Sequence, residues 1–399
     1  MGARRAGGAA AGGHPPTLVA AFLHFDVSFM LWVLLGALGV SISDTLGLTP
    51  AEKGLLVAVP ILSGSLMRVP LGVLSDRFGG RRTGMGMLIA LFVPLLVGWR
   101  AGTSLPILIG VGLLLGVAGA SFAVALPLAS RWYPAERQGL VMGIAAAGNS
   151  GTVVANLVAP RIAASAGWHA VLALAMLPLG IVLVAFASLA KDSPYAAAPA
   201  SASSYVAVLR TRELRWLCLF YAITFGGYVG LGSFMPLLLR DQYGLPGVTA
   251  GYVAALAAFA GSAARPLGGW IADRVGGVRL LSVLLGCIGA LYFAAAAAPP
   301  FRWMSIVLVA TMICLGLGNG AVFQIVPQCF RRRIGVATGV VGATGGLGGF
   351  AIPMLLGHVE QATGSFSVAF ILFGTTVLLA LTALRALAFA ANQTAADSS

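Results

Sequence analysis

Twelve long apolar stretches divide the chain, and short polar segments separate them. Each stretch is near the length of about 20 residues that a helix needs to cross the hydrocarbon core of a bilayer. The stretches lack the alternation of apolar and polar residues typical of a membrane-spanning strand. The pattern therefore predicts twelve transmembrane helices, because a helix satisfies its own backbone hydrogen bonds in lipid. The expected helices cover residues 19–43, 54–75, 83–99, 105–130, 139–163, 168–190, 215–239, 248–272, 280–298, 303–329, 335–359 and 366–390.

Composition agrees with this pattern. Of the 399 residues, 59% are hydrophobic and only 9% are charged, with a mean hydropathy of +0.96, so we expect an integral membrane protein. The net charge of +13 would suit a nucleic-acid binder, but the basic residues are distributed as in a membrane protein. Sixteen of the 24 Lys and Arg residues lie near the amino terminus or in the loops after even-numbered helices. By the positive-inside rule, both termini are predicted in the cytoplasm, in an inner (plasma) membrane, with no nucleic-acid partner.

The two halves of the chain repeat each other. "RVPLGVLSDRFGGRR" at 68–82 matches "RPLGGWIADRVGGVR" at 265–279, and the offset of 197 residues also joins Gly47 to Gly244. Because each half has an even number of spans, a pseudo-twofold axis along the membrane normal should relate them. The expected divisions are a cytoplasmic tail at 1–18, six-helix halves at 19–190 and 215–391, a cytoplasmic linker rich in Ala, Ser and Pro at 191–214, and a cytoplasmic tail at 392–399.

The repeated loop resembles a known family feature. Asp76 and Arg77, followed by two glycines and basic residues, are similar to the loop between the second and third helices of the major facilitator superfamily. Asp273 and Arg274 repeat the pattern in the second half. The resemblance implies a twelve-helix transporter fold. We expect these four residues to form cytoplasmic latches between helix ends that control alternation.

Arg68 lies inside a predicted span, roughly 12 Å from its cytoplasmic end at a rise of 1.5 Å per residue. A single arginine there could extend to the interface, but the repeat places Arg265 at the same depth near the pseudo-twofold axis. Two unpaired cations in a low-dielectric medium repel each other, and an anion between them removes that penalty. A guanidinium group offers planar, forked donors. The pair therefore predicts a site for a small anion.

Glycine is unusually dense in the expected helices 139–163 and 335–359. GxxxG spacing in lipid mostly serves close helix packing. The density of glycine favours a second interpretation, in which these helices slide past their neighbours. The glycines that we single out are Gly148, Gly151, Gly345, Gly346, Gly348 and Gly349.

Longer motifs resemble one family in particular. "FDVSFMLWVLLGALG" at 25–39, "GNSG" at 148–151, "GNGAVFQIVP" at 318–327 and "GATGGLGGFAIP" at 342–353, together with the two arginines, are similar to the nitrate/nitrite porter family of the major facilitator superfamily. The glycine-rich segments resemble its two nitrate signatures. The resemblance implies that nitrate binds between the arginines. Three Ala before Asn149 depart from the Gly or Asn that the family often has there, which leaves the fine shape of the site open.

The resemblance also implies further contacts to the anion. "FYAITFGG" is similar to the family segment that supplies a hydrogen-bonding tyrosine and a packing phenylalanine, here Tyr221 and Phe225. "GASFAVALP" implies Phe122 as the facing aromatic side chain, and "GNSG" implies Asn149 as a polar contact.

Coupling to protons is less constrained. Asp26, with His24 close by in the chain, is the acidic residue expected within a span, and it is either a group that titrates during transport or a solvated residue near the helix start. The first alternative favours nitrate uptake by proton symport. A nitrate/nitrite exchanger would need no titrating residue.

Other functions remain as alternatives. The same fold could carry formate, oxalate or an organic phosphate, and a nitrate sensor without transport is disfavoured by the short loops. No enzyme motif is found, so catalysis, cofactors and metals are not expected. The four cysteines lack a metal-binding spacing. Nitrate, nitrite, protons and membrane lipid are the expected partners of a monomer.

Overall fold

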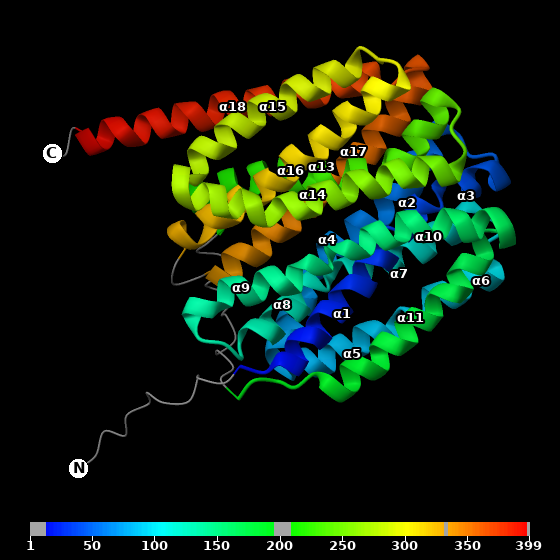
Figure 1. Ribbon diagram of the computed structural model, residues 1–399, viewed down its shortest axis with the longest axis horizontal. Helices are drawn as coiled ribbons and strands as arrows, with labels where there is room; N and C mark the ends of the chain where they lie inside the picture. Colours follow the sequence, from blue (N-terminus) through cyan, green and yellow to red (C-terminus); the bar gives the residue numbers. More distant parts are fainter. Residues whose placement is uncertain (1–12, 195–208, 331–333, 397–399) are drawn as a thin grey trace.

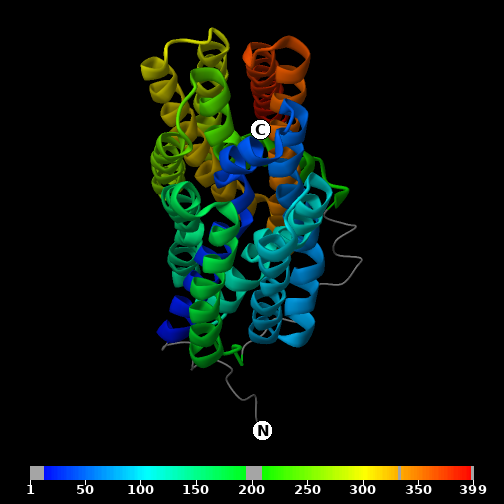
Figure 2. The ribbon, with the colours of Figure 1, turned by 90° about the vertical axis from the view of Figure 1, so that its right-hand side faces the viewer.

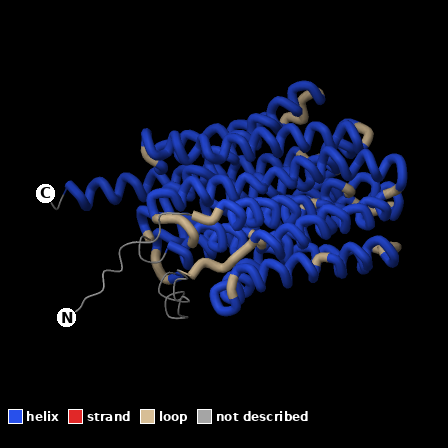
Figure 3. The backbone as a smooth tube through the Cα atoms, turned by 60° about the horizontal axis from the view of Figure 1, so that its bottom comes forward, coloured by secondary structure: helices blue, strands red, loops and turns tan. Residues whose placement is uncertain are grey.

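The structure is a computed structural model that describes residues 13–194, 209–330 and 334–396. The described part is helical, and Figure 3 shows no strand in it. The helices run lengthwise along the molecule, and the first and last of them begin and end towards the same end (Figure 1). We call this the terminal end and the opposite one the distal end.

Within residues 13–194, the amino-terminal half contains six helical columns. Four of them are interrupted and two, α4 and α11, are single helices. In chain order they are α1 (Pro15–Trp32) with α2 (Leu34–Ala37) and α3 (Gly39–Leu46); α4 (Pro50–Phe78); α5 (Gly80–Ala90) with α6 (Phe92–Ala101); α7 (Leu105–Leu115) with the 3₁₀ turn η1 (Gly116–Ala120) and α8 (Phe122–Ser130); α9 (Ala135–Ala146) with the 3₁₀ turn η2 (Ala147–Ser150) and α10 (Gly151–Ala166); and α11 (Trp168–Leu189).

Within residues 212–330 and 334–396, the carboxy-terminal half has six continuous helices. They are α13 (Arg212–Tyr243), α14 (Gly247–Val275), α15 (Gly277–Ala296), α16 (Phe301–Cys329), α17 (Ile334–Thr363) and α18 (Ser367–Ala396).

The twelve columns in the part of the chain that the structure describes confirm the number of helices expected from the sequence. Ten of them are long and apolar enough to cross a membrane when judged by length and composition. The remaining two columns, α1–α3 and α9–α10, are divided into shorter helices. The limits agree with the apolar stretches within a few residues, although α1 begins inside the expected tail 1–18 and α18 runs into the expected tail 392–399. Most of the expected linker lies outside the described residues.

The repeat is visible in how helices begin and end. α4 starts with a capping box in which Thr49 and Glu52 satisfy each other's backbone N–H groups. Gly79 caps its carboxy-terminal end, and Gly276, 197 residues later, caps that of α14, with φ of 93° and 91°. Side chains rarely adopt this conformation, so glycine permits the same sharp turn in both halves.

The two halves pack against each other along two pairs of helices. α4 lies on α17, and α10 lies on α14. A Cβ atom on Gly54 would come within 2.5 Å of the carbonyl oxygen of Pro353, and one on Gly251 within 2.6 Å of that of Asn156. Gly251 lies 197 residues after Gly54, and Pro353 lies 197 residues after Asn156. The repeat therefore relates the two contacts to each other. Figure 2 shows the two halves above and below, with the dark blue α2–α3 segment between them.

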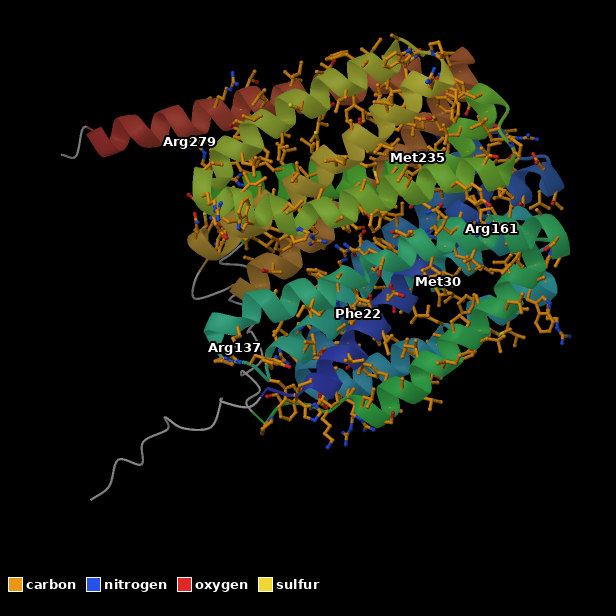
Figure 4. All side chains as sticks on the ribbon, in the orientation of Figure 1. Phe22, Met30, Arg137, Arg161, Met235 and Arg279 are labelled. Atoms are coloured by element: carbon orange, nitrogen blue, oxygen red, sulfur yellow. The ribbon has the colours of Figure 1, made fainter. Side chains whose placement is uncertain are left out.

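Polar contacts between the halves concentrate at the distal end. The Lys53 ammonium contacts both carboxylate oxygens of Asp241, at 2.7 and 2.9 Å, and Arg240 lies 3.4 Å from Asp44. Both ion pairs that join the halves within the described residues are found here. Figure 4 places Arg161 in the same region, between the halves. The distal end is therefore closed in this conformation.

Candidate anion site

Arg68 is the most deeply buried cation of the site, with 3% of its surface exposed. Its Nε donates to the carbonyl oxygen of Gly119 at 3.2 Å, and Nη1 donates to that of Gly342. Its Nη2 is buried and has no hydrogen-bond partner. A buried guanidinium N–H without an acceptor is costly, so this nitrogen is available to a ligand.

Arg265 approaches the same region from α14. Its Nη2 donates to the Tyr221 hydroxyl oxygen at 3.3 Å. The two guanidinium groups are close enough to act on each other electrostatically. Within the described residues neither forms an ion pair with a carboxylate. The structure thus brings together two positive charges that an anion would neutralise.

Aromatic rings surround the arginines. The Arg68 Cζ lies 5.6, 5.8 and 5.1 Å from the ring centroids of Trp32, Phe122 and Phe225. Tyr221 stacks on Phe225 with centroids 5.0 Å apart and an interplanar angle of 6°. These faces attract the cation and exclude water, which strengthens electrostatic interactions inside the site.

Phe323 of α16 completes the enclosure. Its ring lies 5.6 Å from the Arg265 Cζ, 4.9 Å from the Tyr221 ring and 6.1 Å from Phe122 on the opposite half. Sequence reasoning did not assign it a role, although it stands in the "GNGAVFQIVP" motif. The structure also places Trp32 and the carbonyl groups of Gly119 and Gly342 beside Arg68. Every residue has a backbone carbonyl group, so the sequence could not identify these acceptors.

Asn149 lies on η2 and is 3% exposed, with its Oδ1 buried and unpartnered. Its backbone carbonyl accepts a hydrogen bond from the Thr152 hydroxyl at 2.7 Å. η2 packs against α1 and α14, so Asn149 lies at the meeting of the halves. Within the described residues it forms no hydrogen bond with either arginine, and its role as an anion contact stays a prediction.

The six singled-out glycines all lie at close helix contacts. A Cβ on Gly151 would meet the Asp26 carbonyl oxygen at 1.9 Å, and one on Gly348 would meet that of Ala222 at 2.2 Å. Gly345 leaves room for the Tyr221 ring. Packing therefore accounts for these positions. The remaining contacts are Gly148 with Asp26 and Phe25, Gly346 with Ser65, and Gly349 with Val229 and Ile61.

The structure separates the two coupling candidates. Asp26 accepts a hydrogen bond from the Ser150 hydroxyl at 2.6 Å. His24 is fully buried, its Nε2 lies 3.2 Å from the Gly84 carbonyl oxygen, and its ring packs against Phe186. Residues two apart on a helix point in different directions. They form no joint site.

The predicted latch residues lie at the terminal end. Asp76 pairs with Arg131 beyond α8 at 2.5 Å, which joins two helix ends of the same half. Arg77 and Arg274 lie over the neighbouring rings of Phe78 and Trp270. The repeat equivalent of Arg131 is Arg331, which lies outside the described residues, so a matching pair with Asp273 stays a prediction.

Comparisons with known proteins agree with this architecture. The model of the Major Facilitator Superfamily matches residues 20–353. The "Nitrite extrusion protein" of Bacillus subtilis is 34% identical over 357 residues, covering 89% of this chain and 90% of that protein. The "Probable nitrate/nitrite transporter NarK2" of Mycobacterium tuberculosis is 35% identical over 385 residues, covering 93% and 95%.

A solved structure shows the same fold. The crystal structure of a bacterial homologue of the human lysosomal transporter Spinster, in an inward-facing and occupied conformation, aligns with a TM-score of 0.67 and 20% identity, over 94% of this chain and 96% of that one. This protein is a multi-pass membrane protein. The chain belongs to the major facilitator superfamily and, within it, to the family of nitrate and nitrite transporters.

Proposed function

We propose that this protein carries nitrate, with nitrite as a second substrate, across the plasma (inner) membrane by alternating access. The observation that carries the proposal is the pair Arg68 and Arg265, which approach the same aromatic cluster and have no carboxylate partner among the described residues. The names of its relatives point to the same substrates.

The geometry suits a small planar anion. The free Nη2 of Arg68 and the Arg265–Tyr221 pair offer donors from both halves. The ring faces of Phe225 and Phe122 leave a flat, apolar surround. Formate or oxalate would also satisfy the charges, but nitrate matches the forked guanidinium donors on its three oxygens.

The orientation follows from charge. If the basic loops face the cytoplasm, the terminal end is cytoplasmic and the distal end faces outward. The conformation described here is then closed to the outside. Transport requires the two halves to rock so that the distal contacts open while the terminal end closes.

The direction that we favour is uptake with protons. Asp26 lies where α1 meets the "GNSG" segment, and it accepts a hydrogen bond from Ser150. Protonation would remove its charge at the contact between these two helices. An exchanger of nitrate for nitrite is the second candidate, because the arginines alone could bind either anion.

Uptake into proteoliposomes tests the substrate and the coupling together. An inward proton gradient should drive nitrate accumulation and acidify the lumen, with formate competing poorly. Uptake that requires preloaded nitrite and ignores the gradient would establish exchange instead. The proposed function would be rejected if the protein showed no nitrate flux in either arrangement and also bound no nitrate.

Asp26→Asn separates the two modes further. The substituted amide keeps an acceptor for Ser150 but cannot titrate. For a symporter that uses Asp26, gradient-driven uptake should fall to the background of empty liposomes while nitrate/nitrate exchange persists. Asp44→Asn, an exposed carboxylate at the distal end, is the matched control and should leave both activities unchanged.

A further inference from the structure

A cavity of about 610 Å³ lies inside the carboxy-terminal half, between α13, α15, α17 and α18. Its wall is apolar except for Tyr292, His358 and Thr376. The volume is in the range of sites that hold a small organic ligand. Along α17 the wall extends from Gly348 to His358, about 15 Å at the rise of an α-helix. That length is about half of a hydrocarbon core of roughly 30 Å, so the cavity is as deep as one leaflet.

The repeat shows why the cavity exists. In the amino-terminal half the sixth column, α11, packs on α1, α6 and α10. The sixth column of the other half, α18, packs mainly on α15 and touches α13 and α17 only slightly. Figure 1 shows α15 and α18 together along one outer edge of the molecule. The cavity is therefore the space that α18 leaves open against α13 and α17.

The surface around the cavity is one that lipid covers. Leu219 in its wall is 37% exposed, although most of α13 is buried. Leu347 and Leu372, each next to a wall residue in the chain, are also exposed. Exposed leucines on membrane-spanning helices contact acyl chains, which are as apolar as they are. The wall of the cavity is thus continuous with the lipid-facing surface of the protein.

Neither empty space nor water accounts for the cavity. The cost of an empty core cavity rises with its volume, and at about 610 Å³ it would exceed the net stability of a typical domain. Each buried water needs several polar partners, and the polar side chains of the wall are too few to supply them. An apolar occupant taken from the surrounding bilayer removes both costs.

The polar groups give the cavity a direction. Tyr292 lies four residues before the distal end of α15, and His358 is exposed five residues before the distal end of α17. Tyr292 is 3% exposed, and its hydroxyl has no hydrogen-bond partner among the described residues. The deeper wall, which includes Leu219 and Ile223, is apolar. This distribution suits a molecule with a polar end at the distal surface and an apolar chain directed inward.

We propose that the cavity binds one acyl chain of a membrane phospholipid from the distal leaflet. The end of the chain lies near Leu219. The ester carbonyl oxygen accepts a hydrogen bond from the Tyr292 hydroxyl, which satisfies a buried donor, and the phosphate lies at the surface beside His358.

The bound chain supports the anion site from behind. Gly348 and Ala222 are both in the wall, and a Cβ on Gly348 would come within 2.2 Å of the Ala222 carbonyl oxygen. Ala222 follows Tyr221, whose ring packs against Gly345 on the same pair of helices. The chain therefore packs on the α13–α17 contact that positions Tyr221. The lipid site does not depend on which anion is carried.

Photo-crosslinking in proteoliposomes tests the site. The probe is phosphatidylglycerol with a diazirine at the end of one acyl chain, and the labelled residues are identified by peptide mass spectrometry. We expect labelling of Leu219 and Ile223. Thr376→Trp fills the cavity and should lower this labelling about tenfold, equivalent to about 1.4 kcal/mol of binding free energy. Thr375→Trp, at an exposed neighbour outside the wall, is the matched control and should label as the parent does.

Equal labelling of Leu219 in both tryptophan variants would overturn the proposal, and so would labelling confined to exposed side chains of α18 such as Leu379. Either result would show that the chain end does not enter the cavity.

Native mass spectrometry gives a second measurement if Thr376→Trp fails to fold. The parent should retain one phosphatidylglycerol after annular lipid is removed. Tyr292→Phe keeps the ring that packs on Phe370 and Phe373 and loses only the hydroxyl, so occupancy should fall about fivefold. Occupancy equal to that of the parent, or a parent without bound lipid, would also overturn the proposal. Nitrate enters neither measurement, so the lipid site and the proposed function can fail separately.

Discussion

The two halves of this molecule derive from one repeat, yet their helices differ in continuity. The column that contains η1 turns into a 3₁₀ segment where Gly119 meets Trp32, whose ring would lie 2.3 Å from a Cβ at that glycine. The position equivalent to Trp32, 197 residues later, is Val229, and the corresponding helix α16 runs unbroken. A bulky ring in one half and a branched aliphatic side chain in the other explain the difference.

This asymmetry extends to the arginines. Arg68 is anchored by backbone carbonyl groups, one of them from Gly119 in the 3₁₀ turn and one from the opposite half. Arg265 is less buried and contacts a side chain, the Tyr221 hydroxyl. Equivalent residues of a repeat can therefore share a charge and differ in mobility. We interpret Arg68 as the fixed member of the pair and Arg265 as the adaptable one.

Replacement of either arginine by lysine should give the largest effect. Lysine keeps the charge but loses the fork, and with charge-assisted hydrogen bonds of about 1.5–3 kcal/mol each, nitrate transport should fall roughly 100-fold. Arg68→Lys should also lower the melting temperature, because the carbonyl groups of Gly119 and Gly342 lose their donors, whereas Arg265→Lys should not. Thermal unfolding in detergent and liposome uptake measure the two quantities. Near-normal uptake in both variants would reject the anion clamp, and equal destabilisation would remove the distinction between the arginines.

Trp32→Val makes the first half resemble the second. Truncation of a buried Trp costs about 3–5 kcal/mol, and the indole hydrogen bond to the Pro60 carbonyl oxygen at 2.8 Å is lost. We expect a marked fall in thermal stability and in nitrate affinity, because the ring also packs on Arg68. Val229→Ala, at the equivalent position, is the control and should cost less. Wild-type nitrate affinity in Trp32→Val would show that the ring does not position Arg68.

The signature glycines of the two halves allow a direct test of packing. Gly151→Ala and Gly348→Ala place a methyl group against backbone oxygen atoms that cannot rotate away. Overpacking of about 1–3 kcal/mol should lower stability and slow transport in both variants. Gly339→Ala introduces the same methyl group into α17 with no atom within 4 Å, and it should behave as the parent. If all three variants are alike, close packing is not the reason for these glycines.

The smallest expected effects concern the distal ion pairs. Lys53 and Asp241 each expose 14% of their side chains, so Lys53→Met should weaken the distal closure by a few-fold, measured as faster thiol labelling of a cysteine placed between the halves at the distal end. The exposed pair Arg240–Asp44 should contribute at most about 1 kcal/mol. Asp44→Asn should therefore leave the labelling rate unchanged. A larger increase in labelling for Asp44→Asn than for Lys53→Met would show that the Lys53–Asp241 pair is not the main contact that closes the distal end.

The lengths of the apolar stretches determined the number of helices and their limits within a few residues, because each crossing must satisfy its backbone within a fixed thickness. The repeat identified Arg68 and Arg265, because a charged residue without a nearby opposite charge in an apolar stretch can be recognised from the sequence. Motif resemblance then suggested Tyr221, Phe225 and Phe122, and the structure gathers these five residues.

Only the tertiary structure showed what the arginines touch, because carbonyl acceptors belong to every residue and carry no sequence signal. The separation of His24 from Asp26, the role of Phe323 beside Arg265, and the meeting of Phe323 with Phe122 across the halves depend on how helices rotate and cross. Those properties are decided by shape complementarity between surfaces that lie far apart in the chain.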